Sequence, residues 1–332
     1  MFEQAVQSII NEWLPAFFNP QKRIYWGYLA SALFIALLWL SLYRRLSIRR
    51  SLKTIFSRES WLSRSARADY LVMLLNSAIM ILLSPRLLSQ TAVAYLLFEL
   101  LHELFSGRAV IQSSLPTWVI PFAFTLFLFI VDDLARYVLH RLLHQVPWLW
   151  AFHKVHHTAT SLNPFTVFRT HPVEAILFSL RGALVQGFCI AVFFFFFGQQ
   201  VNLLSVLGAS IFTVAFNLLG SNLRHSNISI GLWKPLERIF ISPAQHQIHH
   251  STAPQHIDKN YGVVLAVWDY WFNSHCFSQK NQQLEYGVPG NHVKQHSLRD
   301  LYWQPLVDAW QHFQRHLPEF KRSIVKGQQL NI

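Results

Sequence analysis

Eight of the 17 histidines lie in three windows of five residues, and this spacing is the strongest chemical signal in the chain. Helical residues three and four positions apart share a face, so each window points its imidazoles in one direction. Imidazole suits iron, zinc, copper and nickel better than magnesium or calcium. One metal ion takes about four to six ligands. Eight converging imidazoles therefore predict a site for two metal ions. The windows are HRLLH (His140, His144), HKVHH (His153, His156, His157) and HQIHH (His246, His249, His250).

The other nine histidines are spread singly or in loose pairs. An isolated histidine in an apolar chain is usually a hydrogen-bonded core residue or a surface residue. We interpret seven of the nine in this way: His102, His256, His275, His292, His296, His312 and His316.

The composition indicates a membrane protein. The chain is 52% hydrophobic and only 13% charged, whereas about 25% of residues in an ordinary soluble domain are charged. We predict an all-α integral membrane protein, a helical bundle of about five spans with a cytoplasmic histidine-rich helical cap. A span must cross ~30 Å of hydrocarbon, and the candidate runs are Ile24–Tyr43, Asp69–Ser84, Pro116–Val138, Ala175–Gly198 and Val201–Gly220.

Three further segments are apolar without being candidate spans. Thr91–Phe105 is short and contains two glutamates and a histidine, so we predict a re-entrant or interfacial segment. Residues 2–17 and 306–317 have apolar residues at helical spacing and are predicted to be amphipathic helices. Because Glu3 and Glu12 replace a basic leader, we do not expect a cleaved signal peptide.

The chain reads as one structural domain with three regions. These are an N-terminal membrane region at 1–125, a histidine-containing region at 126–275 and a C-terminal tail at 276–332. The only two cysteines, Cys189 and Cys276, exclude a disulfide framework, a CxxC pair and an iron–sulfur cluster. The net charge of +12 is interpreted as attraction to anionic lipid headgroups, with no nucleic-acid partner.

The segment between the first two candidate spans predicts the orientation. Short basic loops stay in the cytoplasm, and counting five spans onward puts every histidine window on the cytoplasmic side. We therefore expect a multi-pass protein of a bacterial inner membrane or an endoplasmic reticulum membrane, with its histidines facing the cytoplasm. The segment carries eight of the 28 basic residues: Arg44, Arg45, Arg49, Arg50, Lys53, Arg58, Arg64 and Arg67.

Residues around the histidine windows extend the pattern to a multi-part signature. The chain resembles the fatty acid hydroxylase superfamily, whose members include sterol desaturases, sterol methyl oxidases and alkylglycerol monooxygenases. The resemblance runs from Asp133 to about Phe272. Its motifs are Asp133-x3-Tyr137-x2-His140-Arg141-x2-His144, His153-x2-His156-His157, Arg169-Thr170-His171-Pro172-x-Glu174, Ser242-Pro243-x2-His246-x2-His249-His250, Asn260-Tyr261-Gly262 and Trp268-Asp269.

The resemblance implies a membrane-bound non-haem enzyme with two iron ions (Fe2+/Fe3+) that uses dioxygen as co-substrate to hydroxylate or desaturate a membrane lipid. Electrons would come from a separate donor, a ferredoxin or a cytochrome with its reductase, since the sequence shows no HPGG, GxGxxG or iron–sulfur motif. The lipid substrate, the choice between hydroxylation and desaturation, and the oligomeric state stay open. We favour hydroxylation.

The family usually shares some ten histidines between two irons, so the resemblance implies two more ligands, His171 and His225. The alternative for His171 is a polar residue at a helix start before Pro172. A metal-bound imidazole usually donates its second N–H to an acceptor. We expect such supporting roles around the ligands for Asp133, Tyr137, Glu174, Asn260 and Asp269, although Asn260 could equally hold a turn.

Two other function classes fit a polytopic histidine-rich chain. A metal transporter would place ligands at mid-bilayer along a path, not in clusters on one side. A membrane zinc hydrolase would need only three or four ligands, an open coordination position and a nearby general base. The number and kind of bound metal ions distinguish a transporter and a zinc hydrolase from an oxygenase.

A reporter fused after Gln279 or within residues 58–67 is expected to read cytoplasmic, and one fused near Gln199 non-cytoplasmic. The physical reason is the basic segment, which resists translocation. Reporter activity in intact cells measures this. Finding Gln279 and residues 58–67 on opposite sides would refute the count of five spans.

Overall fold

Long apolar helices dominate the residues that the computed structural model describes, namely 15–83, 87–107, 111, 114–206, 209–288 and 296–315. Within these residues, strands occur as one two-residue antiparallel pair, β1 (Ser205–Val206) with β2 (Ala209–Ser210). The expected all-α class is therefore confirmed, with this small exception. The shorter helices are α3 (Ile48–Ile55), α4 (Arg58–Leu62), α10 (Ile211–Leu218), α11 (Lys234–Glu237), α12 (Pro243–His249) and α13 (Val267–Trp271).

Three of the helices are long and apolar enough to cross a membrane. They are α2 (Trp26–Leu38) with its π-helical continuation Trp39–Tyr43, α5 (Arg64–Leu83), and α9 (Pro172–Phe197) with the short turn Gly198–Gln200. They coincide with the first, second and fourth candidate runs. We therefore identify the chain as a membrane protein.

The third candidate run lies on α7, a single helix from Val119 to Gln145. Its 27 residues span about 40 Å, but three charged residues near its middle lower its apolarity. Asp132 pairs with Arg136 on α7 and with Arg181 on α9, at 2.7 Å in each case. These charges are therefore satisfied between the two helices, as charges in an apolar setting must be.

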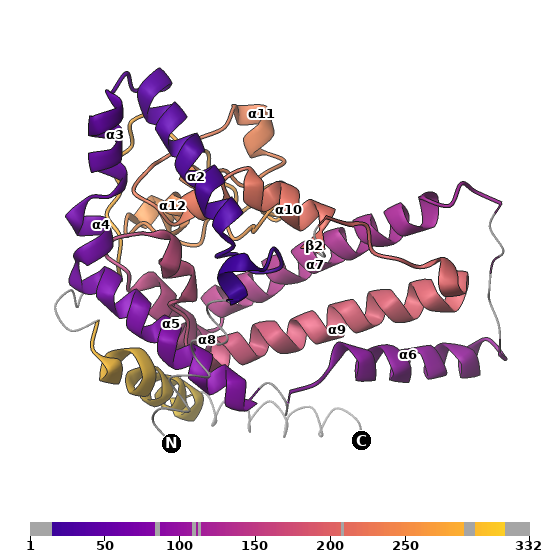
Figure 1. Ribbon diagram of the computed structural model, residues 1–332. Coiled ribbons are helices and arrows are strands. Elements are labelled where there is room, and N and C mark those ends of the chain that lie inside the picture. Colours follow the sequence, from indigo (N-terminus) through magenta and orange to yellow (C-terminus); the bar gives the residue numbers. More distant parts are fainter. Residues whose placement is uncertain are drawn as a thin grey trace.

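The fifth candidate run, Val201–Gly220, is not one helix, and this expectation is corrected. Within it, the 8 residues of α10 reach only about 12 Å. The preceding residues satisfy their backbone in other ways: Leu204 N donates to Thr125 Oγ1 at 2.9 Å, and Ile211 N to Leu204 O at 3.1 Å. Apolarity alone does not distinguish a helix from other apolar structure. In Figure 1 the segment still returns from the far end of α9 to the body of the molecule.

The segment expected to be re-entrant or interfacial forms α6 (Gln90–Leu104), which packs along α9. The helices approach closely because position 187 is glycine: a Cβ there would lie 2.5 Å from the Cβ of Val93. Further along, the rings of Phe98 and Phe194 lie 5.6 Å apart, so α6 runs in the same direction as α9. Its 15 residues reach about 22 Å. The re-entrant or interfacial position of this helix stays a prediction.

The helices fall into two parts in Figure 1. α6, α7 and α9 extend together to one side, whereas α8 (Pro147–His157) and α12 lie in the body at the other end. Here Lys280 lies over the ring of Tyr43, and Arg44 donates to Asn281. The basic segment and the start of the C-terminal tail are therefore neighbours.

The two predicted amphipathic helices have different outcomes. The N-terminal one falls mainly on residues 1–14, which lie outside the described part of the chain. At the other terminus the π-helical turn Arg299–Trp303 continues as a helix to residue 315. Leu301 and Ala309 pack against the body, whereas Leu306, Trp310 and Phe313 are exposed.

A fully buried ion pair joins α5 to the end of α8. Arg169 and Asp69 have 0% exposed side chains, and Arg169 Nη1 donates to Asp69 Oδ1 at 3.0 Å. Arg169 Nε also donates to Val155 O at 3.1 Å and to Thr158 Oγ1 at 3.0 Å. Arg169 therefore fixes the last turn of the helix that carries HKVHH.

Replacing Asp69 by Ala is expected to lower the free energy of unfolding by about 3–5 kcal/mol, because a buried guanidinium then lacks its counter-charge. Thermal unfolding of the full chain in detergent measures the change. Glu59→Ala, on an exposed position of α4, is the control and should cost less than about 1 kcal/mol. Equal effects of the two substitutions would contradict a structural role for the pair.

Candidate metal centre

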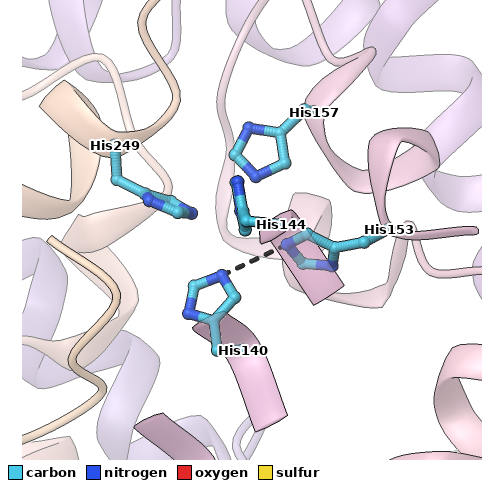
Figure 2. A group of neighbouring side chains, drawn as sticks. All are labelled: His140, His144, His153, His157 and His249. Carbon is cyan, nitrogen blue, oxygen red and sulfur yellow. Dashed lines mark hydrogen bonds between the residues drawn. The ribbon is translucent and has the colours of Figure 1, made fainter. Parts of the chain in front are cut away.

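Nine histidines converge in two adjacent groups. The five-histidine group consists of His140, His144, His153, His157 and His249, and the four-histidine group of His156, His225, His246 and His250. Within each group, one nitrogen of every ring lies within 4.8 Å of the others. In Figure 2 the rings of the five-histidine group surround a common space.

Local sequence explains how three helices deliver eight of these rings, while His225 lies on a loop after the short turn Ser221–Arg224. On α7, His140 and His144 are one turn apart, and α8 starts afresh at Pro147, a residue suited to the first helical turn. α12 begins with a capping box in which Ser242 and Gln245 satisfy each other's backbone N–H groups. These starts determine which face of each short helix carries its histidines.

In the five-histidine group, Nε2 of His140 lies 3.1 Å from Nε2 of His153 (Figure 2). The Nε2 atoms of His144, His157 and His249 are buried and have no hydrogen-bond partner among the described residues. Buried polar atoms are normally paired. Their lack of protein partners indicates that this space suits a cation.

The four-histidine group is tighter still. Nε2 of His225 lies 3.2 Å from that of His156, 3.0 Å from that of His246 and 3.2 Å from that of His250. One ring nitrogen cannot form good hydrogen bonds with three others at once, since a neutral imidazole has a single N–H. Nitrogens bound tetrahedrally at about 2.0–2.1 Å from one ion are about 3.3 Å apart. The donor set therefore fits a metal ion.

The two groups are in direct contact. The rings of His157 and His250 stack with their centroids 4.6 Å apart, and those of His246 and His249 lie 5.6 Å apart. Two ions bound by the two groups would share one chamber.

Burial keeps eight imidazoles of these groups neutral. Desolvation lowers the pKa of His249 to about 3. Desolvation also lowers the pKa values of seven further rings well below 6.5, and the neighbouring histidines add to this effect. Their lone pairs are therefore free for metal at neutral pH. These rings are His140, His144, His156, His157, His225, His246 and His250.

Acceptors behind the five-histidine group orient three of its rings. His153 Nδ1 donates to Glu174 Oε1 at 2.9 Å, in a pair with both side chains 3% exposed. His140 Nδ1 donates to Tyr261 O at 2.7 Å and His249 Nδ1 to Lys259 O at 2.8 Å. Each of these bonds turns Nε2 toward the common space. Glu174 thus lies where an acceptor is expected. The two backbone carbonyls could not be predicted, because every residue has one whatever its side chain.

Asp133 and Asp269 lie one step further from the rings than expected. Asp133 accepts from Val264 N and Leu265 N at 3.0 Å, and Asp269 accepts from Tyr261 N at 2.8 Å. They therefore hold the loop whose carbonyls orient His140 and His249. This corrects the expectation of direct acceptors, because loop N–H groups, not imidazoles, lie next to these carboxylates.

Asn260 and Tyr137 also support this loop. Neither forms a hydrogen bond with a ligand ring among the described residues. Asn260 has a left-handed backbone with φ 57°, and its amide donates to Gln245 O at 3.1 Å. This agrees with the alternative that it holds a turn. Tyr137 packs against Tyr261 and is hydrogen-bonded to Ser274 at 3.0 Å.

His225 joins the four-histidine group, but His171 lies outside both groups. Its Nδ1 accepts from Val173 N at 3.2 Å at the start of α9, and its Nε2 donates to Tyr302 O at 3.1 Å. Both nitrogens are thus engaged. The structure corrects the expectation of a tenth ligand and gives His171 the alternative role, that of capping a helix.

Gln247 is a positioning residue that sequence reasoning missed. It is buried inside the HQIHH window, and its Nε2 donates to Leu223 O, Ser226 O and Ile228 O at 3.0–3.1 Å. It therefore holds the loop that carries His225. An uncharged amide between histidines gave no signal beyond its polarity. Five of the seven histidines interpreted as ordinary lie outside both groups, and the other two, His292 and His316, lie outside the described residues.

A cavity of about 400 Å³ reaches both groups of histidines. Phe178 and Val263 contribute apolar walls. The cavity shares Arg23, Val167, Thr170 and Ala175 with a second pocket of about 270 Å³, whose lining includes Ile24, Met73 and Met80. The two pockets thus adjoin, and the second leads away from the histidines along α5.

Comparison with known proteins shows which family and relatives this part of the chain resembles. The family model described as fatty acid hydroxylase matches residues 125–274. Alkylglycerol monooxygenase from Danio rerio is 32% identical over 189 residues, 56% of this chain and 37% of the relative. An ornithine lipid hydroxylase from Rhizobium tropici is 26% identical over 52% of this chain and 48% of the relative. Methylsterol monooxygenase 1 from Danio rerio is 31% identical over 49% of this chain and 50% of the relative.

The matched part of the chain thus spans between about a third and a half of these relatives' lengths, 37% to 50%. No solved structure matches the chain.

Metal-free protein is expected to lose stability as the pH falls below about 6.5. The unfolded imidazoles take up protons there, whereas the folded ones, whose pKa values are lowered, do not. The contribution of these rings to the free energy of unfolding is thus fully present above pH 6.5. As the pH falls towards the pKa of the folded state, each ring loses up to about 1.4 kcal/mol of this contribution per pH unit. Thermal unfolding in detergent with a chelator, from pH 7.5 to 5.5, measures it. A midpoint that does not change over this range would contradict buried neutral rings.

Proposed function

We propose that the protein, whose residues 125–274 match the fatty acid hydroxylase family model, is a membrane-bound, metal-dependent oxygenase that hydroxylates a lipid. The observation that carries the proposal is the pair of adjoining histidine groups, in which five and four ring nitrogens converge. Such a donor set suits iron. The names of the three relatives all refer to oxidation of lipids.

The nine histidines would hold two iron ions, one in each group. When bound, these ions supply the activation of dioxygen by which an unactivated C–H bond is oxidised. The balanced reaction is R–H + O2 + 2 electrons + 2 H+ giving R–OH + H2O. A separate ferredoxin, or a cytochrome with its reductase, would supply the electrons.

The protein's own residues orient and protect the centre. Glu174, Tyr261 O and Lys259 O each accept the N–H of a ligand ring, so the opposite nitrogen is held as a lone-pair donor. Eight of the nine histidines are at most 7% exposed, so bulk water has little access. Excluding water limits side reactions of a strong oxidant.

The lipid would enter through the pocket along α5. Its Met73, Met80 and Ile24 provide an apolar wall, and Met side chains adapt to irregular chains. The adjoining cavity brings the substrate against His140, His153 and His225. An apolar entry next to membrane-spanning helices suits a molecule that diffuses in the bilayer.

The proposed orientation keeps the histidines accessible to a cytoplasmic electron donor. The contact of Lys280 with Tyr43 and of Arg44 with Asn281 supports one shared side for the basic segment and the C-terminal region. Positive charge in short loops favours the cytoplasm. A zinc hydrolase or a metal transporter gains no support, since nine converging ligands exceed what either class needs.

Purified wild-type protein is expected to contain about two irons per chain. Replacing His144, His157 or His249 by Ala should lower the iron content and reduce lipid oxidation at least about 100-fold, while the protein stays in the membrane. Loss of one ligand weakens metal binding more than it unfolds a helical bundle. Metal analysis of the purified protein, together with mass spectrometry of membrane lipids for a gain of one oxygen, measures both effects.

His312→Ala, on a half-exposed ring outside both groups, is the control and should keep both iron and activity. One zinc per chain would favour the hydrolase instead. Retained oxidation in two of the three ligand variants would refute the iron-dependent oxygenase.

A further inference from the structure

Four arginines line the cavity that reaches the histidine groups, against a single carboxylate, Glu174. Glu174 is engaged by His153 Nδ1 at 2.9 Å. The lining of the cavity therefore carries a strong excess of positive charge, although it lies beside apolar helices. The four are Arg23, Arg136, Arg181 and Arg224.

Two of the four arginines have a carboxylate partner. Asp132 binds Arg136 Nε through Oδ2 and Arg181 Nη1 through Oδ1, at 2.7 Å in each case. These two arginines share one carboxylate between α7 and α9, which offsets half of their positive charge.

Arg23 and Arg224 have no carboxylate within ion-pair distance among the residues that the structure describes. Arg23 Nη2 donates to Ser221 O at 2.7 Å, and Arg224 Nε donates to the same oxygen at 3.3 Å. Two guanidinium groups thus meet at one carbonyl. Arg23 Nη1 and Arg224 Nη2 keep their N–H groups without an acceptor in the described part of the chain.

This arrangement places like charges together at a site that is largely withdrawn from solvent. Arg224 is only 3% exposed and Arg23 is half-buried. Mutual repulsion of buried cations costs free energy, and an anion between them would offset that cost. The planar fork of arginine matches the oxygens of phosphate or carboxylate.

We propose that Arg23 and Arg224 bind the anionic group, a phosphate or a carboxylate, of the lipid that the protein oxidises. This inference rests on the proposed function, which it deepens by naming the substrate class. The remaining chain of the lipid would extend into the adjoining pocket past Met73 and Met80.

The shared cavity also bears on the position of oxidation. Arg224 directly precedes His225 in the sequence, and Arg23, His156 and His246 line the same space of about 400 Å³. The anionic group and the reacting carbon thus occupy one small cavity. Oxidation is therefore expected in the part of the lipid that is close to its anionic end.

Binding of four probes to the full-length, metal-loaded protein in phosphatidylcholine nanodiscs tests the proposal. The probes are octyl phosphate, octanoate, octanol and inorganic phosphate, measured by titration calorimetry against empty nanodiscs. We expect an octyl anion to bind at least about 10-fold more tightly than octanol, since hydrogen bonds to charged groups are worth more than neutral ones. The tighter of the two anions identifies the phosphate or the carboxylate.

Arg23→Gln and Arg224→Gln should each weaken binding of the octyl anion about 10-fold or more, with metal content unchanged. Arg238→Gln is the matched control, because this arginine stacks on Tyr270 away from the cavity, and its affinity should equal that of wild type. If Arg224→Gln loses metal through its neighbour His225, then Arg23→Gln, further along the chain from any ligand, decides. Arg23→Lys, which keeps the charge, should recover part of the affinity.

Equal binding of octanol and the octyl anions, or unchanged affinity in Arg23→Gln, would overturn the proposal. Inorganic phosphate binding as tightly as octyl phosphate would also overturn it, by assigning the cavity to free phosphate. These readouts do not depend on turnover. Anion binding without iron or lipid oxidation would sink only the proposed function, whereas iron and oxidation without anion binding would sink only this inference.

Discussion

The structure depends on burying nine imidazoles face to face in a chain that is otherwise apolar. Each neutral ring has one N–H and one lone pair, and the rings are too closely packed to satisfy one another: His225 Nε2 alone has three ring nitrogens within 3.2 Å. Only a partner that accepts several lone pairs at once resolves this, and a metal cation is such a partner. The helix starts, the loop at Tyr261 and the amide of Gln247 are all arranged around this requirement.

Support for the rings is built in two tiers. Backbone carbonyls of Lys259 and Tyr261 contact the rings, and the carboxylates of Asp133 and Asp269 hold the loop that presents those carbonyls. Backbone acceptors are less mobile than side chains. Ordering them around the centre therefore costs less conformational entropy. Asn260, at φ 57°, lets the loop turn sharply enough to place both carbonyls.

Much of the centre could be predicted because its signal is local. Spacing of three and four residues identified eight of the converging histidines, and His225 followed from the number of ligands that the family resemblance implies. His171 could not be separated from a ligand by sequence, because a histidine that caps α9 and one that binds metal look alike until the partners of both nitrogens are known. Tertiary partners also decided the region 201–220, where Thr125 Oγ1 satisfies backbone that a helix would otherwise pair. The carbonyl acceptors carry no side-chain signal at all.

The unbroken course of α7 has a mechanical consequence. One helix of 27 residues carries both the Asp132 pair with Arg181 and, two turns later, His140. A rod of about 40 Å that tilts by about 5° displaces one end by roughly 3–4 Å relative to the other. Helices adjust their tilt to the thickness of the bilayer, whereas the rings from α8 and α12 sit on short helices with their own anchors. A change of tilt in α9, which is long and apolar enough to cross a membrane and is tied to α7 through Arg181, would thus shift His140 relative to the rings on α8 and α12.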